Sequence, residues 1–430
     1  MPETQSTGSS VFHHVTCPYC GLLCDDLTVQ GKANELKVSQ NGCDKAKTGF
    51  SRRVPAAFPQ IDGRRSDFEP AVQHAAALLS KARQPLYSGL ATDVAGMRAV
   101  IALAERTGGV LDHMYGSALR RNIQTVQELG LISTTLSEIR NRADLLVLLG
   151  TDAADYARFF ERTFGAEGLN GAEPRELVFI GGKAPAKPAG LAATVTTQTI
   201  ACDVQALGEV VLALRGLLRG QRLSAKEIAG IKKATLEKLC ERMRLARYGV
   251  LVWDAGRLDF PHSDLIVQML AELLRELNQS TRFAGFPLGG NEGATGATNV
   301  CAWLTGYPLR VGFSQGYPVY EPERFSTRHM LASGDTEILV WIAAITPIPP
   351  PKSTVPTIVL GQPNVDLDPQ PAVFFPVATP GLDHRGHLFR CDSVVSLPLQ
   401  QLRASLFPAV ATVIDAINDT LQKGRRVNQA

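Results

Sequence analysis

The sequence lacks three features that would each indicate a whole class of protein. It has no surplus of one charge, because 44 Lys and Arg against 41 Asp and Glu leave a formal net charge of +3, whereas nucleic-acid-binding proteins are normally basic. No apolar run approaches the roughly 20 residues that a helix needs to cross a bilayer. The N-terminal segment carries no basic stretch followed by an apolar one. We therefore expect a cytoplasmic protein that contacts neither nucleic acid nor membrane.

Several familiar catalytic motifs are also missing. The chain contains no G-x-S-x-G elbow, no P-loop and no H-E-x-x-H. It does contain ample material for a large core, since 45% of its 430 residues are hydrophobic and 20% are charged. At about 150 residues per domain, this length predicts roughly two to three domains.

Cysteine is unevenly distributed along the chain. Four cysteines stand singly, where a buried apolar role is usual: Cys202, Cys240, Cys301 and Cys391. Four others gather near the N-terminus as C-x2-C-x3-C with one more beyond: Cys17, Cys20, Cys24 and Cys43. Four thiolates on a short segment suit an iron–sulfur cluster or a structural zinc, and the x3 spacing favours the cluster. The alternative is a loop of free thiols. A disulfide framework is not expected, because a reducing compartment keeps thiols reduced.

Apolar runs that alternate with helical patterns predict an α/β fold with buried parallel sheets. Runs that are apolar on both faces are typical of such sheets, and they occur at 85–89, 144–149, 177–180, 249–253, 338–342 and 357–360. Helical spacing predicts helices over 71–82, 93–106 and 264–277. Alternation around a Gly-containing turn predicts a hairpin of 27–31 with 35–38.

The order of these elements suggests four parts. They are a small Cys-rich part (1–55), a first α/β lobe (56–246), a second α/β lobe (247–371) and C-terminal strands with a helix (372–430). Ser224 and Glu227 have the spacing of a capping box, which predicts a long exposed helix to Ala246 that connects two lobes. A terminal helix is expected over 399–426.

One glycine-rich segment is a candidate ligand-binding loop. The stretch 289–297, GGNEGATGA, follows a predicted strand and leads into a helical pattern at 299–305. Closely spaced glycines let backbone N–H groups approach a phosphate or a pterin, so Asn291, Gly293 and Gly296 are the candidate cofactor-binding residues. The spacing is not G-x-G-x-x-G, and a tight loop at a sheet edge is the alternative.

Several segments in one order along nearly the whole chain resemble the B subunit of formylmethanofuran dehydrogenase. This family is related to the molybdopterin-dependent formate dehydrogenases. The segment 17–27, CPYCGLLCDDL, resembles the family's cluster loop, and NGC at 41–43 resembles the turn that carries its fourth ligand. Three further segments also resemble the family: 135–144, 305–318 and 376–392. The resemblance implies an iron–sulfur lobe followed by Rossmann-like α/β lobes of the molybdopterin oxidoreductase type. These lobes would hold a bis-pterin tungsten or molybdenum centre that interconverts carbon dioxide and formate.

The sequence departs from the family at the expected metal ligand. The resemblance implies a Cys-His pair shortly after Asp112, and the alignment places it at Ala118 and Leu119. Ala118 offers no ligand atom, Leu119 transfers no proton, and no cysteine lies between Cys43 and Cys202. Prolines at 346–351 also remove N–H donors from a segment expected to contact phosphate. We therefore expect no catalytic residues and no tungsten or molybdenum bis-pterin, while a [4Fe–4S] cluster on the four N-terminal cysteines remains an expectation.

Without the metal ligand, the sequence resembles most the corresponding chain of the bacterial formyltransferase/hydrolase complex. That complex works in one-carbon metabolism, where it passes a formyl group from a tetrahydromethanopterin carrier to a methanofuran-like carrier and releases formate. The resemblance implies a scaffold whose partners are the other subunits, with 224–246 and 399–426 as candidate contact surfaces. Two alternatives stay open: an active dehydrogenase subunit with a non-cysteine metal ligand, and a different pterin- or zinc-binding protein.

Overall fold

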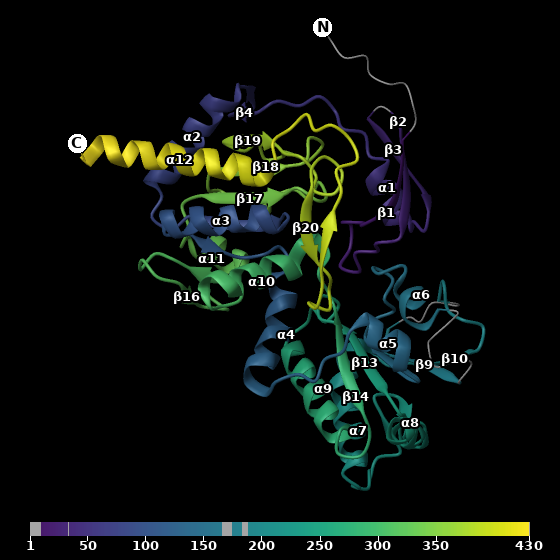
Figure 1. The fold of residues 1–430 in the computed structure, drawn as a ribbon. Helices are drawn as coiled ribbons and strands as arrows, with labels where there is room; N and C mark the ends of the chain where they lie inside the picture. The colour runs from purple at the N-terminus through teal and green to yellow at the C-terminus, as the bar shows by residue number, and fades with distance from the viewer. Residues whose placement is uncertain (1–9, 33, 166–173, 183–187, 430) are drawn as a thin grey trace. The chain divides into compact units, whose positions relative to one another are not determined.

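The computed structural model describes residues 10–32, 34–165, 174–182 and 188–429. The chain divides into two compact units, each a mixture of helices and strands (Figure 1). Unit 1 is built from two separate stretches, Met1–Gly116 and Gly290–Ala430, and unit 2 from the stretch between them, Ser117–Gly289. Unit 2 is therefore inserted into unit 1 in sequence.

Unit 1 is organised around a nine-stranded sheet of order β16-β15-β7-β6-β17-β18-β19-β4-β5. The five central strands from β7 to β19 run parallel, and an antiparallel pair closes each end. The strands are β4 (Gln60–Ile61), β5 (Arg64–Arg65), β6 (Leu86–Ala91), β7 (Val110–Leu111), β15 (Val311–Gly312), β16 (Val319–Tyr320), β17 (Leu339–Ala343), β18 (Thr357–Gly361) and β19 (Val373–Pro376). The central strands are buried almost throughout, as their apolar sequences dictate.

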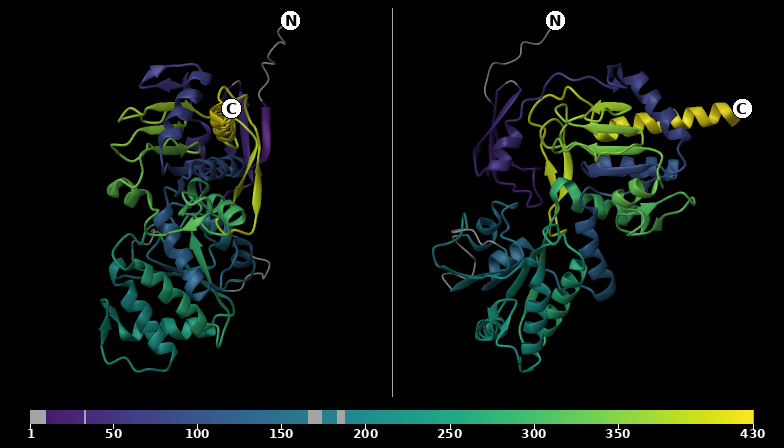
Figure 2. Two further views of the ribbon diagram at one scale, coloured as in Figure 1. Left: turned by 90° about the vertical axis from the view of Figure 1, so that its left-hand side faces the viewer. Right: turned by 180° about the vertical axis from the view of Figure 1, so that it is seen from behind.

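Helices cover both faces of this sheet. The helices of unit 1 outside its N-terminal lobe are α2 (Phe68–Lys81), α3 (Val94–Thr107), η2 (Asn291–Gly293), α10 (Ala294–Thr305), α11 (Thr327–Ser333) and α12 (Val410–Gln429). Helix α12 packs along α2 and α3 (Figure 2). On the other face, Met330 of α11 joins an apolar cluster with Trp341 and Val359. A hairpin of β20 (Gly386–Phe389) and β21 (Ser396–Leu399) lies beside α10.

The N-terminal part of unit 1 is a small lobe that carries the four clustered cysteines. Its sheet has the order β1-β2-β3, formed by β1 (Ser10–Val15), β2 (Leu27–Lys32) and β3 (Glu35–Gln40), and helix α1 (Asp44–Phe50) packs against β3. Leu36 and Val38 face inward on β3 while their neighbours are exposed. This alternation confirms the predicted hairpin.

Unit 2 is organised around an all-parallel sheet of order β10-β9-β8-β13-β14. Its strands are β8 (Leu145–Leu149), β9 (Arg175–Ile180), β10 (Val195–Ile200), β13 (Gly249–Asp254) and β14 (Phe283–Leu288), with a separate hairpin of β11 (Glu227–Ile228) and β12 (Ile231–Lys232). Its helices are α4 (Gly116–Leu129), α5 (Leu136–Arg142), α6 (Phe159–Phe164), η1 (Val204–Ala206), α7 (Leu207–Leu218), α8 (Lys233–Leu245) and α9 (Ser263–Leu277). Every residue of β8 and β13 is buried, as expected for central strands.

The structure groups the predicted strands differently from their order along the chain. Strand β13 pairs with β8, so the expected boundary near residue 246 falls inside the sheet of unit 2. Strand β17 pairs with β6, more than two hundred residues earlier in the chain. Local sequence pattern identifies each strand, but it carries no information on which distant strand becomes its parallel neighbour.

Two predicted helices begin later than expected. The segment after Ser224 forms the β11–β12 hairpin, whose turn residues Ala229 and Gly230 both have positive φ, and α8 begins only at Lys233. Helix α8 buries Leu236, Leu239, Cys240 and Met243 in the core of unit 2, so it is not an exposed connector between lobes. The terminal helix begins at Val410 because Pro408 cannot lie in a helix interior.

Among the described residues, none of the helices combines the length and the apolar composition that a membrane crossing requires.

Candidate functional site

The four clustered cysteines lie on and beside one closed loop of the N-terminal lobe. The loop begins after β1 and is closed at its base by the N–H of Cys17, which donates to the carbonyl of Cys24 at 2.8 Å. Inside it, the N–H of Leu23 donates to the carbonyl of Cys20 at 3.1 Å. Cys17, Cys20 and Cys24 are buried, and Cys43 is half-buried at the N-terminal cap of α1.

The surroundings of this loop favour protonated thiols. Burial raises the pKa of Cys17 well above its ordinary value, and the nearby Cys20 raises it further. Burial also raises the pKa of Cys20, because a thiolate loses solvation in an apolar environment. All four cysteines are free of disulfides. In the absence of a metal Cys17 and Cys20 are neutral thiols, and a metal would have to displace their protons.

The chemistry of these donors fits an iron–sulfur cluster, but the side chains are not gathered around one point. Cys20, Cys24 and Cys43 all lie near enough to Cys17 to raise its pKa. Yet within the residues that the structure describes, no group of three or more His, Cys, Asp and Glu side chains is arranged to hold a metal ion. The loop thus provides a suitable set of ligand atoms, and the cluster itself stays a prediction.

The structure brings the cysteine loop into contact with the predicted glycine-rich loop. The N–H of Gly21 donates to Oδ1 of Asn291 at 3.0 Å. The carbonyl of the same Gly21 accepts from the N–H of Cys391 at 2.8 Å. Gly21 is therefore held from both sides by segments that lie 270 and more residues further along the chain. Sequence spacing indicated neither contact.

The two candidate glycines of the glycine-rich loop differ in how strictly the structure requires glycine at their positions. Gly293 has a φ of +73°, and a Cβ there would lie 2.7 Å from the carbonyl oxygen of Thr92, so only glycine fits. Helix α10 begins at Ala294, five residues before the predicted helical pattern, and Gly296 therefore lies in its first turn. A Cβ at Gly296 would meet only ordinary contacts with Phe389.

Glu292, which the sequence did not single out, is the buried acid of this loop. Its carboxylate accepts from the hydroxyl of Thr346 at 2.8 Å and from the N–H of Thr346 at 3.1 Å. Burial raises the pKa of Glu292 to about 7, against the lowering effect of these hydrogen bonds and of Arg52 and Lys45. Thr346 precedes the proline-rich segment, so the carboxylate takes one of the few N–H donors that this segment retains.

His113 is a second buried group that sequence reasoning missed. Its Nδ1 accepts from the N–H of Tyr115 at 3.0 Å, so Nε2 carries the proton and donates to the carbonyl of Glu292 at 3.1 Å. Burial lowers the pKa of His113 to about 4, although the bond to Glu292 opposes this. The imidazole is therefore neutral at physiological pH, with both nitrogens occupied.

These groups lie at the carboxyl ends of the parallel strands of unit 1. His113 follows β7, Thr346 follows β17, and Gln362 follows β18 directly. Arg52, in the segment after α1, donates to Oε1 of Gln362 at 2.8 Å, which ties the cysteine lobe to this edge. Crevices outside the carboxyl ends of strands are the usual ligand sites of open α/β sheets. A polar residue one to three positions beyond the end of a strand is therefore the signal that would have identified them.

Ala118 and Leu119 lie in the first turns of α4, in unit 2, whereas the cysteine and glycine-rich loops belong to unit 1. Ala118 is half-buried and packs against the apolar core of unit 2. A Cβ built on Gly256 would lie 3.9 Å from the Ala118 Cβ. Ala118 therefore acts as a small apolar packing residue in its own unit.

Comparison with known proteins shows that this chain is similar to the B subunits of two kinds of enzyme complex. No family model matches the chain. It is 30% identical over 293 residues to the B subunit of the formyltransferase/hydrolase complex of Methylorubrum extorquens, covering 68% of this chain and 75% of that protein. It is 28% identical over 431 residues to the B subunit of the tungsten-containing formylmethanofuran dehydrogenase 2 of Methanocaldococcus jannaschii, covering 94% of this chain and 96% of that one.

Two solved structures resemble the fold. The formyltransferase/hydrolase complex of M. extorquens, solved with methylofuran, contains a chain that is 26% identical with a TM-score of 0.73, over 85% of this chain and 99% of that one. Acetylene hydratase from Pelobacter acetylenicus is 10% identical with a TM-score of 0.62, over 96% of this chain and 69% of that one. The second likeness concerns the fold alone.

Proposed function

The chain belongs to the family of B subunits of the formyltransferase/hydrolase complex, and from this premise we propose that it is the scaffold chain of such a complex. In this proposal the complex passes a formyl group from a tetrahydromethanopterin carrier to a methanofuran-like carrier and releases formate. Partner subunits carry out that chemistry, and this chain holds them in place without a redox centre of its own. The parallel strands of its two large sheets are interpreted as the centres of Rossmann-like lobes, as the family resemblance implies.

The observation that carries the proposal is the residue at position 118. A tungsten or molybdenum centre of the expected type needs a protein thiolate, and Ala118 supplies a methyl group packed against an apolar core. A shifted alignment cannot supply the missing sulfur, because the sequence has no cysteine from 44 to 201.

Glu292, in the glycine-rich loop of unit 1, supports the same conclusion. The Thr346 N–H is the type of donor that holds a phosphate, and here it is hydrogen-bonded to a buried carboxylate at 3.1 Å. An anionic cofactor at this place would meet a second negative charge once Glu292 ionises. These contacts favour a loop that is complete without a cofactor.

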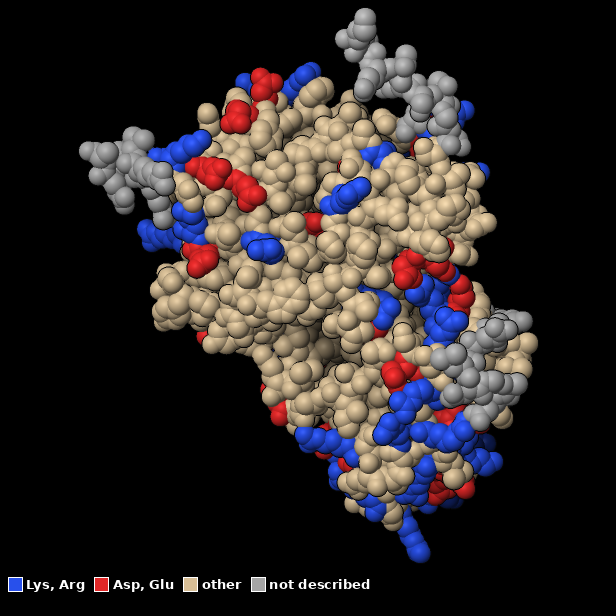
Figure 3. Space-filling view, in the orientation of Figure 1, with Lys and Arg blue, Asp and Glu red and all other residues tan. Residues whose placement is uncertain are grey.

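The surface of unit 1 supports a role in assembly. A wide area of the face shown in Figure 3 carries few Lys, Arg, Asp or Glu side chains, and the cores of protein interfaces are similarly depleted of charge. Trp303, Leu304 and Tyr317 expose more than half of their surface, and large aromatic side chains are typical anchors of interfaces. The expected contact face on α12 is less suitable, since α12 buries Val413, Ile414 and Ile417 within unit 1.

We further propose that the four N-terminal cysteines hold a structural [4Fe–4S] cluster in the assembled protein. Three of the four thiols are buried, and Cys20, Cys24 and Cys43 all lie near enough to Cys17 to raise its pKa, which supports this. Such a cluster would fix the cysteine loop, and its binding energy would add to the stability of the lobe.

The alternative function is an active dehydrogenase subunit, and the four retained cysteines favour it. Metal analysis of the purified complex distinguishes this alternative from the scaffold function. We expect neither tungsten nor molybdenum, and no formate oxidation with an artificial electron acceptor. One equivalent of either metal together with formate oxidation would overturn the scaffold function.

Deletion of this chain tests the role in assembly. We expect the deletion to abolish hydrolase activity because the other subunits no longer assemble. Size-exclusion chromatography with activity assays on the same fractions measures both properties. Normal assembly and turnover without this chain would contradict the proposal.

A further inference from the structure

Strand β10 is an outer strand of the unit 2 sheet (Figure 1), and its side chains are exposed on both faces of that sheet. It runs from Val195 to Ile200, pairs with β9 in an unbroken register, and has four exposed residues in its middle. The sequence contains no Lys, Arg, Asp or Glu from 188 to 202 and no proline from 189 to 202. Proteins normally protect an exposed strand edge with charge, proline, a bulge or a covering segment.

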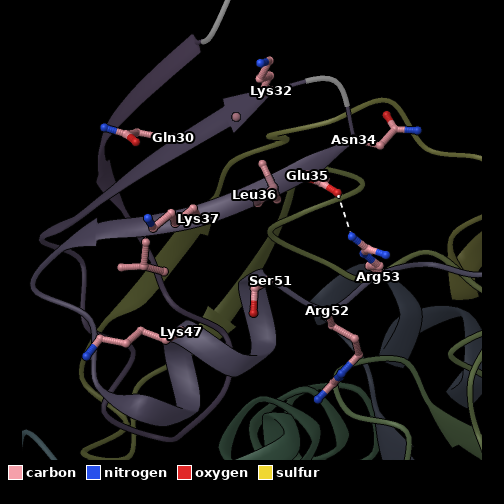
Figure 4. Close-up of a pocket in the computed structure, with 12 residues that line it drawn as sticks. Gln30, Lys32, Asn34, Glu35, Leu36, Lys37, Lys47, Ser51, Arg52 and Arg53 are labelled. Atoms are coloured by element: carbon pink, nitrogen blue, oxygen red, sulfur yellow. Dashed lines mark hydrogen bonds and ion pairs between the residues drawn. The ribbon is translucent and has the colours of Figure 1, made fainter.

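The other outer strands of the three largest sheets each show such a protective feature. Strand β3 carries the charged Glu35, which pairs with Arg53 at 3.4 Å (Figure 4). The register of β1 with β2 is interrupted by an irregularity. Strand β14 is covered on its outer side, where the N–H of Gly285 donates to the carbonyl of Ile132 at 2.7 Å. Strands β5 and β16 have only two residues each. Strand β10 therefore differs from every other outer strand of these sheets.

Two residues of β10 direct their backbone groups to the open edge. The carbonyl of Ile200 accepts from the N–H of Gly181 at 3.2 Å, so the backbone groups of Ile200 point towards β9. Because these groups alternate in direction along a strand, those of Thr197 and Thr199 point away from β9. Within the described residues, neither threonine forms a backbone hydrogen bond outside the sheet. Val195 points the same way, but its N–H already donates to the preceding turn.

The absence of charge at this edge suits a second copy of the same strand. Two identical strands related by a twofold axis run antiparallel, and any charged side chain near the axis would face a like charge, which destabilises the pair. A different partner would not impose this restriction. The one cation bound to the strand is Arg242, which donates to Gln198 at 2.7 Å and pairs with Glu176 at 2.9 Å.

The open backbone groups also define the register of such a pair. With the twofold axis at Gln198, Thr197 of each copy lies opposite Thr199 of the other. Both residues then use their N–H and their carbonyl, and each pair exchanges two hydrogen bonds, or about four in total. Thr–Thr pairs across antiparallel strands are themselves favourable.

We propose that β10 pairs antiparallel with β10 of a second copy of this chain, so that the two five-stranded sheets continue into each other. The contact is small compared with standard protein interfaces, so the two copies should associate in a concentration-dependent equilibrium. The pairing uses only the edge of unit 2 and does not depend on the scaffold function.

Disulfide cross-linking tests the pairing and its register. The two copies of Gln198 would form a non-hydrogen-bonded pair with Cα atoms about 4.5 Å apart, a separation that a disulfide can span. Gln198→Cys in the purified complex should therefore link two copies of the chain when oxidised glutathione is the oxidant. The matched control Thr196→Cys places the two sulfur atoms four residues apart along the strands and should not link them. Non-reducing gel electrophoresis measures the linked fraction.

Charge at the edge tests the same contact without an added cysteine. Thr197→Lys with Thr199→Lys places lysine opposite lysine in both pairs, so the complex should lose its concentration-dependent association in sedimentation velocity. The matched control, Ser224→Lys with Ala225→Lys, adds the same charge to unit 2 outside this edge and should associate like the wild type. All four positions are exposed, so both double variants should retain the wild-type melting temperature.

Four results would overturn the proposal. The first is no linked dimer of Gln198→Cys, and the second is equal linking of both cysteine variants, which would indicate random collision. The third is equal association of the two lysine variants. The fourth is loss of another subunit from the complex of the Thr197→Lys, Thr199→Lys variant, which would assign this edge to that subunit.

Discussion

The cysteine loop and the position of Ala118 are the two places where the family resemblance implies metal chemistry, and the chain treats them differently. The loop retains all four thiols and is held by hydrogen bonds from Gly21 to Asn291 and from Cys391 to Gly21. Position 118, where the resemblance implies the metal ligand, holds an alanine that packs as an ordinary apolar residue of α4. The cysteine loop is therefore tied by hydrogen bonds to distant parts of unit 1, whereas Ala118 only fills space in unit 2, so a change at the loop should have the larger effect.

The largest effect is expected at the cysteine loop. Cys20→Ala should remove any brown colour and visible absorbance of anaerobically purified protein, and it should lower the yield of the complex more than the activity per assembled complex. The matched control is Cys240→Ala, which removes an equally buried thiol from α8 in unit 2. Colourless wild-type protein with four titratable thiols in this loop would refute the cluster.

Glu292 should give unit 1 a stability that falls with rising pH. Its pKa is about 7 in the folded chain against an ordinary value of 4.5. The group therefore favours folding most below pH 4.5, and this contribution is lost as the pH rises to about 7. The Glu292→Gln variant has no carboxyl group to ionise here. Between pH 4.5 and 7, the free energy of unfolding of the wild type should therefore fall by about 3 kcal/mol relative to that of the variant. Urea unfolding at pH 4.5 and 7.5 measures the difference.

His113 should contribute the opposite pH dependence. Its pKa is about 4 when folded against an ordinary value of 6.5, so its contribution is complete above pH 6.5 and is lost as the pH falls towards 4. His113→Gln should be less stable than the wild type near neutral pH, because both hydrogen bonds of the buried imidazole are lost. That deficit should shrink by about 3 kcal/mol from pH 6.5 to 4. A deficit that is constant across this range would show that His113 is not buried in its neutral form.

A smaller effect is expected where the two loops meet. Asn291→Ala removes the acceptor for the Gly21 N–H and should cost about 1 kcal/mol. The same change should speed the reaction of Cys20 with a thiol reagent, because the loop is held less firmly. Asn122→Ala, which removes an acceptor for Trp253 at 2.9 Å in unit 2, should cost a similar amount without changing thiol reactivity. Equal reactivity in both variants would disprove the role of Asn291.

The smallest effect is expected at Ala118. Ala118→Cys restores a sulfur but not the proton-transferring partner at Leu119, and it leaves Glu292 bound to Thr346. Formate oxidation should therefore stay at background, and the melting temperature should change little. Formate oxidation in this variant alone would mean that the rest of a redox site is intact.

Local sequence predicted the individual elements of this fold well. The apolar runs of β8 and β13 were predicted as buried strands and form them, and Asp93 and Gly108 delimit α3 as capping rules require. The segment after Ser224 was predicted wrongly, because the Ala229–Gly230 turn formed a hairpin in place of a helix. The division into units was decided by pairing between distant strands, which leaves no trace in a local pattern.

The sequence by itself determined which donor atoms the chain possesses. It places four thiols near the N-terminus and none from 44 to 201, and no fold can create a missing ligand. Only the tertiary structure decided that Gly21 lies between Asn291 and Cys391, and that Glu292 and His113 are buried beside each other at one sheet edge. Their altered pKa values follow from desolvation by neighbours distant in sequence, because the solvation of an ionisable group depends on what surrounds it in space.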